Sequence, residues 1–294
     1  MRQRHGVMWG GLVLAAAGAL VAAAARPGGA APALRPDPAV SGFTAAICNA
    51  HPPRLAHAYA HGISVVAPGS IVAVANAAIS NEDHAELLFK LGLLEGHLIV
   101  GRELIDAKQT QLALPHFGHP IRELYDEISG ELTRRGVTGF DGELIALEAL
   151  AAGKPTDPAT AAQYSKVIGI IAAVRATVPA GLLDNQRFML GVLGEVATIS
   201  AEDYGESIEG NRIEKPVEYH DSRGYLAYAD RELRRLEGRP ALRGDPGLTL
   251  ARAKLTEMRA VTGPLLPPER PLRSVAAYKA VVAQFKQAAA AARA

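Results

Sequence analysis

The chain has 294 residues, of which 49% are hydrophobic, and this is enough to bury a large core and excludes a disordered chain. Its 31 basic and 30 acidic residues leave a formal net charge of +1, so charge does not indicate a nucleic-acid partner. A single cysteine excludes an internal disulfide framework and a cysteine-rich metal cluster.

The first 33 residues have the pattern of a secretory signal peptide. Arg2 and Arg4 precede an apolar run over residues 11–25, which as a helix is about 22 Å long and too short for the roughly 30 Å hydrocarbon core of a membrane. An Ala-Pro-Ala sequence at residues 31–33 offers a cleavage site, and three alanines at residues 23–25 offer an alternative. We therefore expect export to the periplasm. An uncleaved membrane anchor is the competing interpretation.

Two halves are expected after the signal peptide, at residues 34–151 and residues 152–294. β-Branched alternation, the pattern of a strand, occurs only within residues 63–74. Residues 62–80 carry no charged side chain and are interrupted by Pro68. They fit two buried segments better than a membrane-spanning helix, and contact with a membrane stays open.

Apolar periodicity predicts helices along most of the chain. The most regular apolar stripe spans residues 82–107, with Asn81 as the expected N-cap. A segment with proline and glycine at residues 152–158 separates the two halves, and its Asp157 is the expected cap of the next helix. The fold class is therefore all-α, with helical hairpins or a bundle in two packed halves. The further helices are predicted at residues 110–117, 120–134, 143–153, 158–178, 182–204, 217–237, 247–262 and 274–293.

Histidine is concentrated in the first half, where seven of the nine histidines lie between residues 51 and 119. Imidazole suits iron, copper, zinc or nickel, and a carboxylate completes such a site. His116 and His119 are three residues apart, and Glu123 follows four residues later. Because the loop after the preceding helix is short, the chain can reverse and bring these residues toward His97. We predict that His97, His116, His119 and Glu123 bind iron or copper; zinc is not excluded by these donors.

Three other histidines are weaker candidates for metal ligands. His57 and His61 are four residues apart, so a helix would place both rings on one face. His84 shares a predicted helix with His97 but lies about 220° around its axis. No HExxH motif, nucleophile elbow or phosphate-binding loop occurs in the sequence, so it indicates no catalytic residue and no small-molecule substrate.

The second half carries an acid-rich turn over residues 203–221, with Asp203-Tyr204, then Gly210, then Glu218-Tyr219. This segment resembles the periplasmic helical segment of bacterial high-affinity iron permeases, in which an acidic–Tyr pair, a glycine turn and a Glu–Tyr pair join two helices. The sequence contains neither the permease membrane domain nor its Arg-Glu-x-x-Glu motif. The resemblance implies an accessory, metal-handling module in the periplasm with a membrane metal transporter as its partner.

The acids of this turn permit two interpretations. Carboxylate oxygens suit hard cations and ferric iron, which makes Glu218 a further, weaker candidate ligand. The competing interpretation, which we favour, is a solvated turn whose Tyr204 and Tyr219 pack inward with their hydroxyls hydrogen-bonded. Gly210 suits a left-handed turn between the two helices. The acids concerned are Asp203, Glu206, Glu209, Glu214, Glu218 and Asp221.

The function that follows from these patterns is that of an exported helical protein that handles iron or copper as an accessory module. A different class of function also fits, in which a helical scaffold docks onto a membrane transporter or another exported protein and its buried histidines are structural. This alternative depends on a spacing similar to that of a tetratricopeptide helical pair. The residues with that spacing are Gly101, Leu104, Ala113 and Phe117.

Overall fold

The structure is a computed structural model, and it describes residues 78–292. The predicted signal peptide, His57, His61, the strand-like pattern at residues 63–74 and most of residues 62–80 lie outside the described residues, so these remain predictions. No helix within residues 78–292 combines the length and the apolar character needed to cross a membrane. The described residues belong to one compact unit.

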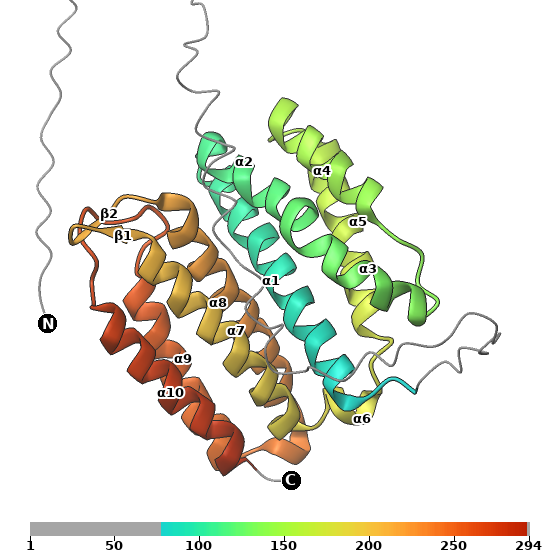
Figure 1. Ribbon diagram of the computed structural model, residues 1–294, viewed down its shortest axis with the longest axis vertical. Helices are drawn as coiled ribbons and strands as arrows, with labels where there is room; N and C mark the ends of the chain where they lie inside the picture. Colours follow the sequence, from blue (N-terminus) through green and yellow to red (C-terminus); the bar gives the residue numbers. More distant parts are fainter. Residues whose placement is uncertain (1–77, 293–294) are drawn as a thin grey trace, which may run out of the picture. The chain divides into compact units, whose positions relative to one another are not determined.

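Helices make up most of the described chain, which confirms the all-α prediction (Figure 1). The first group comprises α1 (Asn81–Asp106), α2 (Thr110–His119), a π-helical turn η1 (Pro120–Leu124), α3 (Tyr125–Arg134), α4 (Asp141–Gly153) and α5 (Pro158–Arg175). The second group comprises α6 (Ala180–Leu183), α7 (Gln186–Glu206), α8 (Pro216–Glu237), a 3-10 turn η2 (Pro240–Leu242), α9 (Pro246–Thr262) and α10 (Val275–Ala291). A short hairpin, β1 (Ile208–Glu209) and β2 (Arg212–Ile213), joins α7 to α8.

Side-chain caps determine where several helices begin. The hydroxyl of Ser80 accepts a hydrogen bond from the Asp83 amide at 3.1 Å, and the Asp83 carboxylate accepts one from the Ser80 amide at 2.8 Å. This reciprocal capping box makes Ser80, rather than the predicted Asn81, the cap of α1. Asp157 caps α5 as predicted, since its carboxylate accepts from the amide of Ala159 at 2.8 Å.

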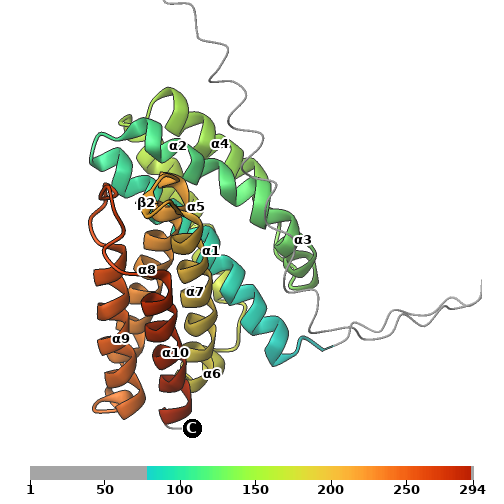
Figure 2. The ribbon, with the colours of Figure 1, turned by 60° about the vertical axis from the view of Figure 1, so that its left-hand side comes forward.

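Four of the helices, α7 to α10, form a bundle. α7 packs against α8 and α10, and α9 packs against the same two helices, so the four surround a shared apolar core (Figure 2). Polar groups in this core are paired: the hydroxyl of Ser200 on α7 lies 2.6 Å from that of Tyr278 on α10 and donates to the carbonyl of Ser222 on α8. Such pairing removes most of the desolvation penalty of burying these groups.

α1 packs against α8, and the two helices approach closely at a pair of glycines. A Cβ atom on Gly224 would overlap the carbonyl oxygen of Gly96, and a Cβ atom on Gly96 would overlap the ring of Tyr225. One turn earlier on α1, Gly92 lies against the ring of Tyr228. This close approach places His97, the residue after Gly96, against the first half of α8.

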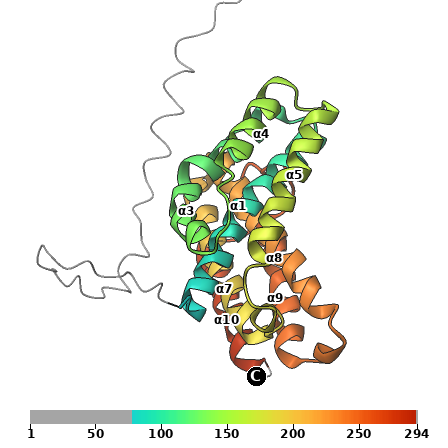
Figure 3. The ribbon, with the colours of Figure 1, turned by 90° about the vertical axis from the view of Figure 1, so that its right-hand side faces the viewer.

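α2 folds back on α1 and carries the remaining helices of the first group. A Cβ atom on Gly101 would lie 3.1 Å from the ring of Phe117, so this glycine allows α2 to approach α1 closely. The tetratricopeptide-type spacing therefore corresponds to a helical hairpin. α4 packs against α2. α5 packs against α4 (Figure 3). The predicted boundary between the halves falls near the turn from α4 to α5.

The helical conformation continues without a gap from α2 through η1 to α3, whereas the sequence predicts a break between residues 117 and 120. Pro120 has no amide hydrogen, so it cannot satisfy the carbonyl of His116 within a regular α-helix. The helix instead widens into a π-helical turn, in which the amide of Tyr125 donates to the carbonyl of Pro120 five residues earlier. His116, His119 and Glu123 therefore lie within and just before this turn.

The middle of the acid-rich turn, residues 208–213, is a two-stranded hairpin, which the sequence did not predict. Gly210 and Asn211 have φ angles of 55° and 63°. Positive φ at both central residues is the requirement of a two-residue hairpin turn. The left-handed turn predicted at Gly210 is confirmed. The predicted helix over residues 182–204 is divided into α6 and α7, and Asn185 caps the second of these.

The close approach of α1 and α8 can be tested with Gly224→Ala. The added methyl group overlaps the backbone of α1, and overpacking of this kind typically lowers the free energy of unfolding by about 1–3 kcal/mol. The matched control is Gly191→Ala on α7, where nothing lies within 4 Å of the added Cβ. This control should gain about 0.5–1 kcal/mol from helix propensity. Urea unfolding measures both variants, and equal stability of Gly224→Ala and wild type would contradict the close contact.

Candidate metal centre

Three of the predicted ligands meet a carboxylate from the other half of the chain. Nδ1 of His97 on α1 lies 2.6 Å from Oδ1 of Asp221 on α8, and Nδ1 of His116 on α2 lies 2.7 Å from the same oxygen. Nδ1 of His119 lies 3.5 Å from Oδ2 of Asp221 and 3.9 Å from Oε2 of Glu123. The structure thus brings His97, His116 and His119 together around Asp221, with Glu123 beside His119.

This group of side chains is almost completely shielded from solvent. His97 is 2% exposed, His116 0%, His119 8% and Asp221 4%. The rings of His97 and His119 meet edge to face with centroids 5.2 Å apart, and those of His116 and His119 lie 6.1 Å apart. Buried ionisable groups are stable only when they are paired or bind a metal. This cluster therefore needs either shared protons or a cation.

The separations of the ligand atoms suit a bound ion. Donor atoms around one ion lie roughly 3.0–3.4 Å apart when the bonds are about 2.0–2.1 Å long. In the structure the ligand atoms of His97, His116 and Asp221 all lie within 4.8 Å of one another, and so do those of His97, His119 and Glu123. Small side-chain movements would convert either group into a coordination sphere of imidazole and carboxylate.

The neighbouring histidines favour the ionised, negatively charged form of the Asp221 carboxylate. Burial opposes its ionisation, but His97 and His116 hold the pKa of Asp221 well below its usual range. Burial lowers the pKa of His116, and Asp221 only partly offsets this effect. Burial also acts against charge on His119, yet the carboxylate of Asp221 raises its pKa. A metal ion would replace the protons that the imidazoles share with Asp221, so its binding releases protons.

Two residues that no sequence pattern indicated, Tyr225 and His220, lie next to the cluster. The hydroxyl of Tyr225 lies 3.0 Å from Nε2 of His97 and holds that ring with Nδ1 facing Asp221. Nε2 of His220 lies 3.0 Å from the carbonyl of Leu265, and its ring contacts His116 edge to face. Burial and the neighbouring His116 lower the pKa of His220 to about 4, so this ring is neutral near pH 7.

His84, one of the weaker candidates, lies elsewhere. Its Nδ1 lies 2.9 Å from Nη1 of Arg135 at the end of α3. His84 and His97 are thirteen residues apart on α1, which places them about 20 Å apart along the helix axis. His84 is therefore outside the cluster.

The tyrosines of the acid-rich turn are buried and hydrogen-bonded. The hydroxyl of Tyr204 donates to the carbonyl of Arg273 at 2.9 Å, and that of Tyr219 donates to the carbonyl of Pro264 at 2.6 Å. The structure thus places these two residues as the solvated-turn interpretation expects.

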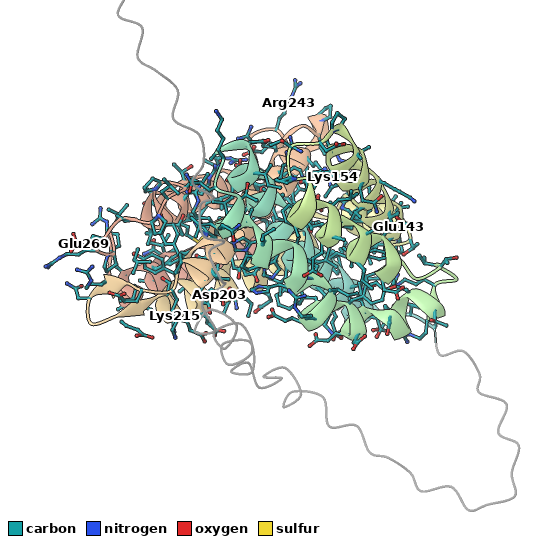
Figure 4. The ribbon with its side chains drawn as sticks, turned by 90° about the horizontal axis from the view of Figure 1, so that it is seen from above. Glu143, Lys154, Asp203, Lys215, Arg243 and Glu269 are labelled. Carbon is teal, nitrogen blue, oxygen red and sulfur yellow. The ribbon has the colours of Figure 1, made fainter. Side chains whose placement is uncertain are left out.

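The acids of this turn divide into two sets. Glu209 and Glu214 form surface ion pairs with Lys215 and Arg212. Asp203 and Asp221, in contrast, are buried, and Figure 4 labels Asp203 on the side of the bundle that borders the green helices. Glu218 lies three residues before Asp221 on α8 and is half-buried. Asp221 is therefore the acid of the turn that the histidines contact.

Asp221→Ala should destabilise the metal-free protein strongly. The change leaves His97 and His116 buried without their shared partner, and breaking a buried pair in this way lowers the free energy of unfolding by about 3–5 kcal/mol. Asp106→Ala on α1 is the control, because it removes only a surface ion pair with Arg102, which typically contributes about 1 kcal/mol or less. Chemical unfolding in the presence of a chelator measures both. Similar losses in the two variants would show that Asp221 holds no buried network.

Comparison with known proteins bears on the bundle. Residues 179–294, less than half of the chain, match the family model of the iron permease-associated 4-helix bundle domain. The matched residues contain α7 to α10, and this agrees with the observed bundle and confirms the resemblance noted for the acid-rich segment. They include Asp221 but not α1 or α2, which carry His97, His116 and His119. No curated protein and no solved structure matches the chain.

Proposed function

We propose that this protein binds a transition-metal ion, iron or copper, and acts in the periplasm as an accessory module of a membrane metal transporter. The ligands are His97, His116, His119 and Asp221, with Glu123 at the edge of the site. One observation carries the proposal: imidazoles from α1 and α2 converge on a single buried carboxylate from α8.

Unsatisfied nitrogen atoms favour a metal site over a purely structural cluster. Nε2 of His116 and Nδ1 of His119 are buried and have no hydrogen-bond partner among the described residues. Buried polar atoms in folded proteins are nearly always satisfied. A structural cluster would leave Nε2 of His116 unpaired and would hold Nδ1 of His119 only by its 3.5 Å contact with Oδ2 of Asp221. An ion near these atoms would give both nitrogens a ligand bond.

The donor set permits iron, and the family match favours it over the other metals. Imidazole with carboxylate suits iron, copper and zinc alike. Asp221 belongs to the segment that matches the iron permease-associated domain. That match supports iron as the cargo and an iron permease as the class of partner. The signal-peptide pattern over residues 1–33 supports export, which would bring the protein to the periplasmic face of such a transporter.

Metal content after equilibration tests the binding function. The purified chain, with His51, His57 and His61 replaced by Ala to remove other imidazoles, is incubated anaerobically with Fe²⁺, and separately with Cu²⁺ and Zn²⁺, then dialysed and analysed for metal. We expect bound iron or copper, and we expect His116→Ala with His119→Ala to lower the affinity by at least about tenfold.

His84→Ala is the matched control, because His84 is on α1 but outside the cluster, and it should leave the metal content unchanged. The scaffold alternative predicts a different result. If His116→Ala lowers stability and none of the three metals binds to any variant, the histidines are structural and the protein is a docking scaffold.

The proposed location is tested by the mass of the exported protein. Expression of the full sequence in a Gram-negative host should yield a periplasmic protein that begins at Leu34, or at Arg26 if cleavage follows residues 23–25. Intact-mass measurement of the periplasmic fraction distinguishes these products. Recovery of the uncleaved chain from membranes alone would favour the anchor interpretation, and recovery from the cytoplasm would refute export.

A further inference from the structure

The two carboxylate oxygens of Asp221 face different histidines. Oδ1 lies within 2.7 Å of Nδ1 of both His97 and His116, whereas Oδ2 lies 3.5 Å from Nδ1 of His119. A carboxylate whose two oxygens lie near different potential metal ligands can bridge two metal ions, with one ion at each oxygen. In two-metal sites the ions are about 3.5–4 Å apart.

The second set of donors lies at the junction of α2 and the π-helical turn, nearer the surface. His119 is 8% exposed, and its Nδ1 has no hydrogen-bond partner among the described residues. That nitrogen lies 3.9 Å from Oε2 of Glu123, whose side chain is 36% exposed. The His119 and Glu123 pair is therefore closer to solvent than the pair formed by His97 and His116.

A further carboxylate, that of Glu218, lies on the same helix as Asp221. Glu218 is three residues before Asp221, so both project from the same face of α8, and Oε2 of Glu218 is buried without a hydrogen-bond partner among the described residues. A buried carboxylate oxygen that lacks a hydrogen-bond partner favours a nearby cation.

We propose that the centre holds two metal ions bridged by Asp221, an inner ion bound by His97 and His116 and an outer ion bound by His119, Glu123 and Glu218. The proposal rests on the proposed function, because it assigns a second ion to the same site. The inner position is rich in nitrogen and fully buried. The outer position is rich in oxygen, which suits hard cations, and it lies next to solvent.

The two positions should differ in strength and order of filling. A buried position with imidazole donors retains its ion more tightly than a partly exposed position with carboxylates, which water can enter. We therefore expect the inner position to fill first. The outer ion should be lost first on dilution or on addition of a weak chelator.

Titration with Mn²⁺, followed by electron paramagnetic resonance, tests this arrangement. The chain with His51, His57 and His61 replaced by Ala is freed of metal and titrated anaerobically. About two ions should bind per chain, and the second equivalent should convert the six-line signal of an isolated Mn²⁺ ion into the broadened signal of a coupled pair. The same titration with Fe²⁺, followed by metal analysis, should give the same stoichiometry.

Substitutions that keep side-chain shape separate the two positions. Glu218→Gln and Glu123→Gln should each bind about one ion, with the six-line signal of an isolated ion retained throughout. Glu209→Gln is the matched control, because Glu209 pairs with Lys215 on the surface of the same turn, and it should bind two ions like the starting chain.

Each outcome of the titration decides one point. A stoichiometry of about one ion in the starting chain, unchanged in Glu218→Gln, would overturn the two-ion arrangement and leave the proposed function standing. Two ions in every variant would place the second ion elsewhere and also overturn it. No bound Mn²⁺ and no bound iron, copper or zinc would overturn the proposed function itself.

Discussion

Two helices from distant parts of the chain approach each other closely because Gly96 and Gly224 have no side chains at their contact. The residues beside these glycines are thereby brought within hydrogen-bonding distance across the interface. His97 follows Gly96, and Asp221 and Tyr225 lie on the same part of α8 as Gly224. Larger residues at the contact would separate the helix axes, and His97 would no longer reach Asp221. The candidate centre thus depends on a packing constraint as much as on its own chemistry.

The burial of a carboxylate among three imidazoles does not favour folding by itself. Removing charged groups from water is costly, and a well-packed apolar cluster of similar volume is often at least as stable. In the bundle core the buried polar groups are neutral: the hydroxyls of Ser200 and Tyr278 form a hydrogen bond. Burying neutral groups in this way has a smaller desolvation penalty than burying a carboxylate. The cluster around Asp221 instead leaves Nε2 of His116 and Nδ1 of His119 without hydrogen-bond partners among the described residues, and the proposed cation would compensate for this.

Local patterns were sufficient to predict most of the fold. Apolar periodicity and caps predicted α1, α5 and α8 to within a few residues, because these signals act between neighbours in sequence. The π-helical turn at Pro120 was not predicted, since it depends on how α2 continues past a missing amide hydrogen. His116 and His119 were identified by their spacing, but Asp221, which is 105 residues from His116, was assigned to a separate acid-rich turn. Only the pairing of α1 and α2 with α8 joins these two features.

The family match and the histidines divide the centre between two parts of the chain. The matched bundle supplies Asp221 and the hydroxyl of Tyr225, whereas α1 and α2 supply the imidazoles and lie outside the match. Without α1, the face of α8 that carries Asp221, Tyr225 and the ring of Tyr228 would lose its cover, and burial of these side chains would be lost with it. In this protein the bundle therefore requires α1 for packing, and the same helix brings His97 to Asp221, so one interface serves both stability and the proposed metal site.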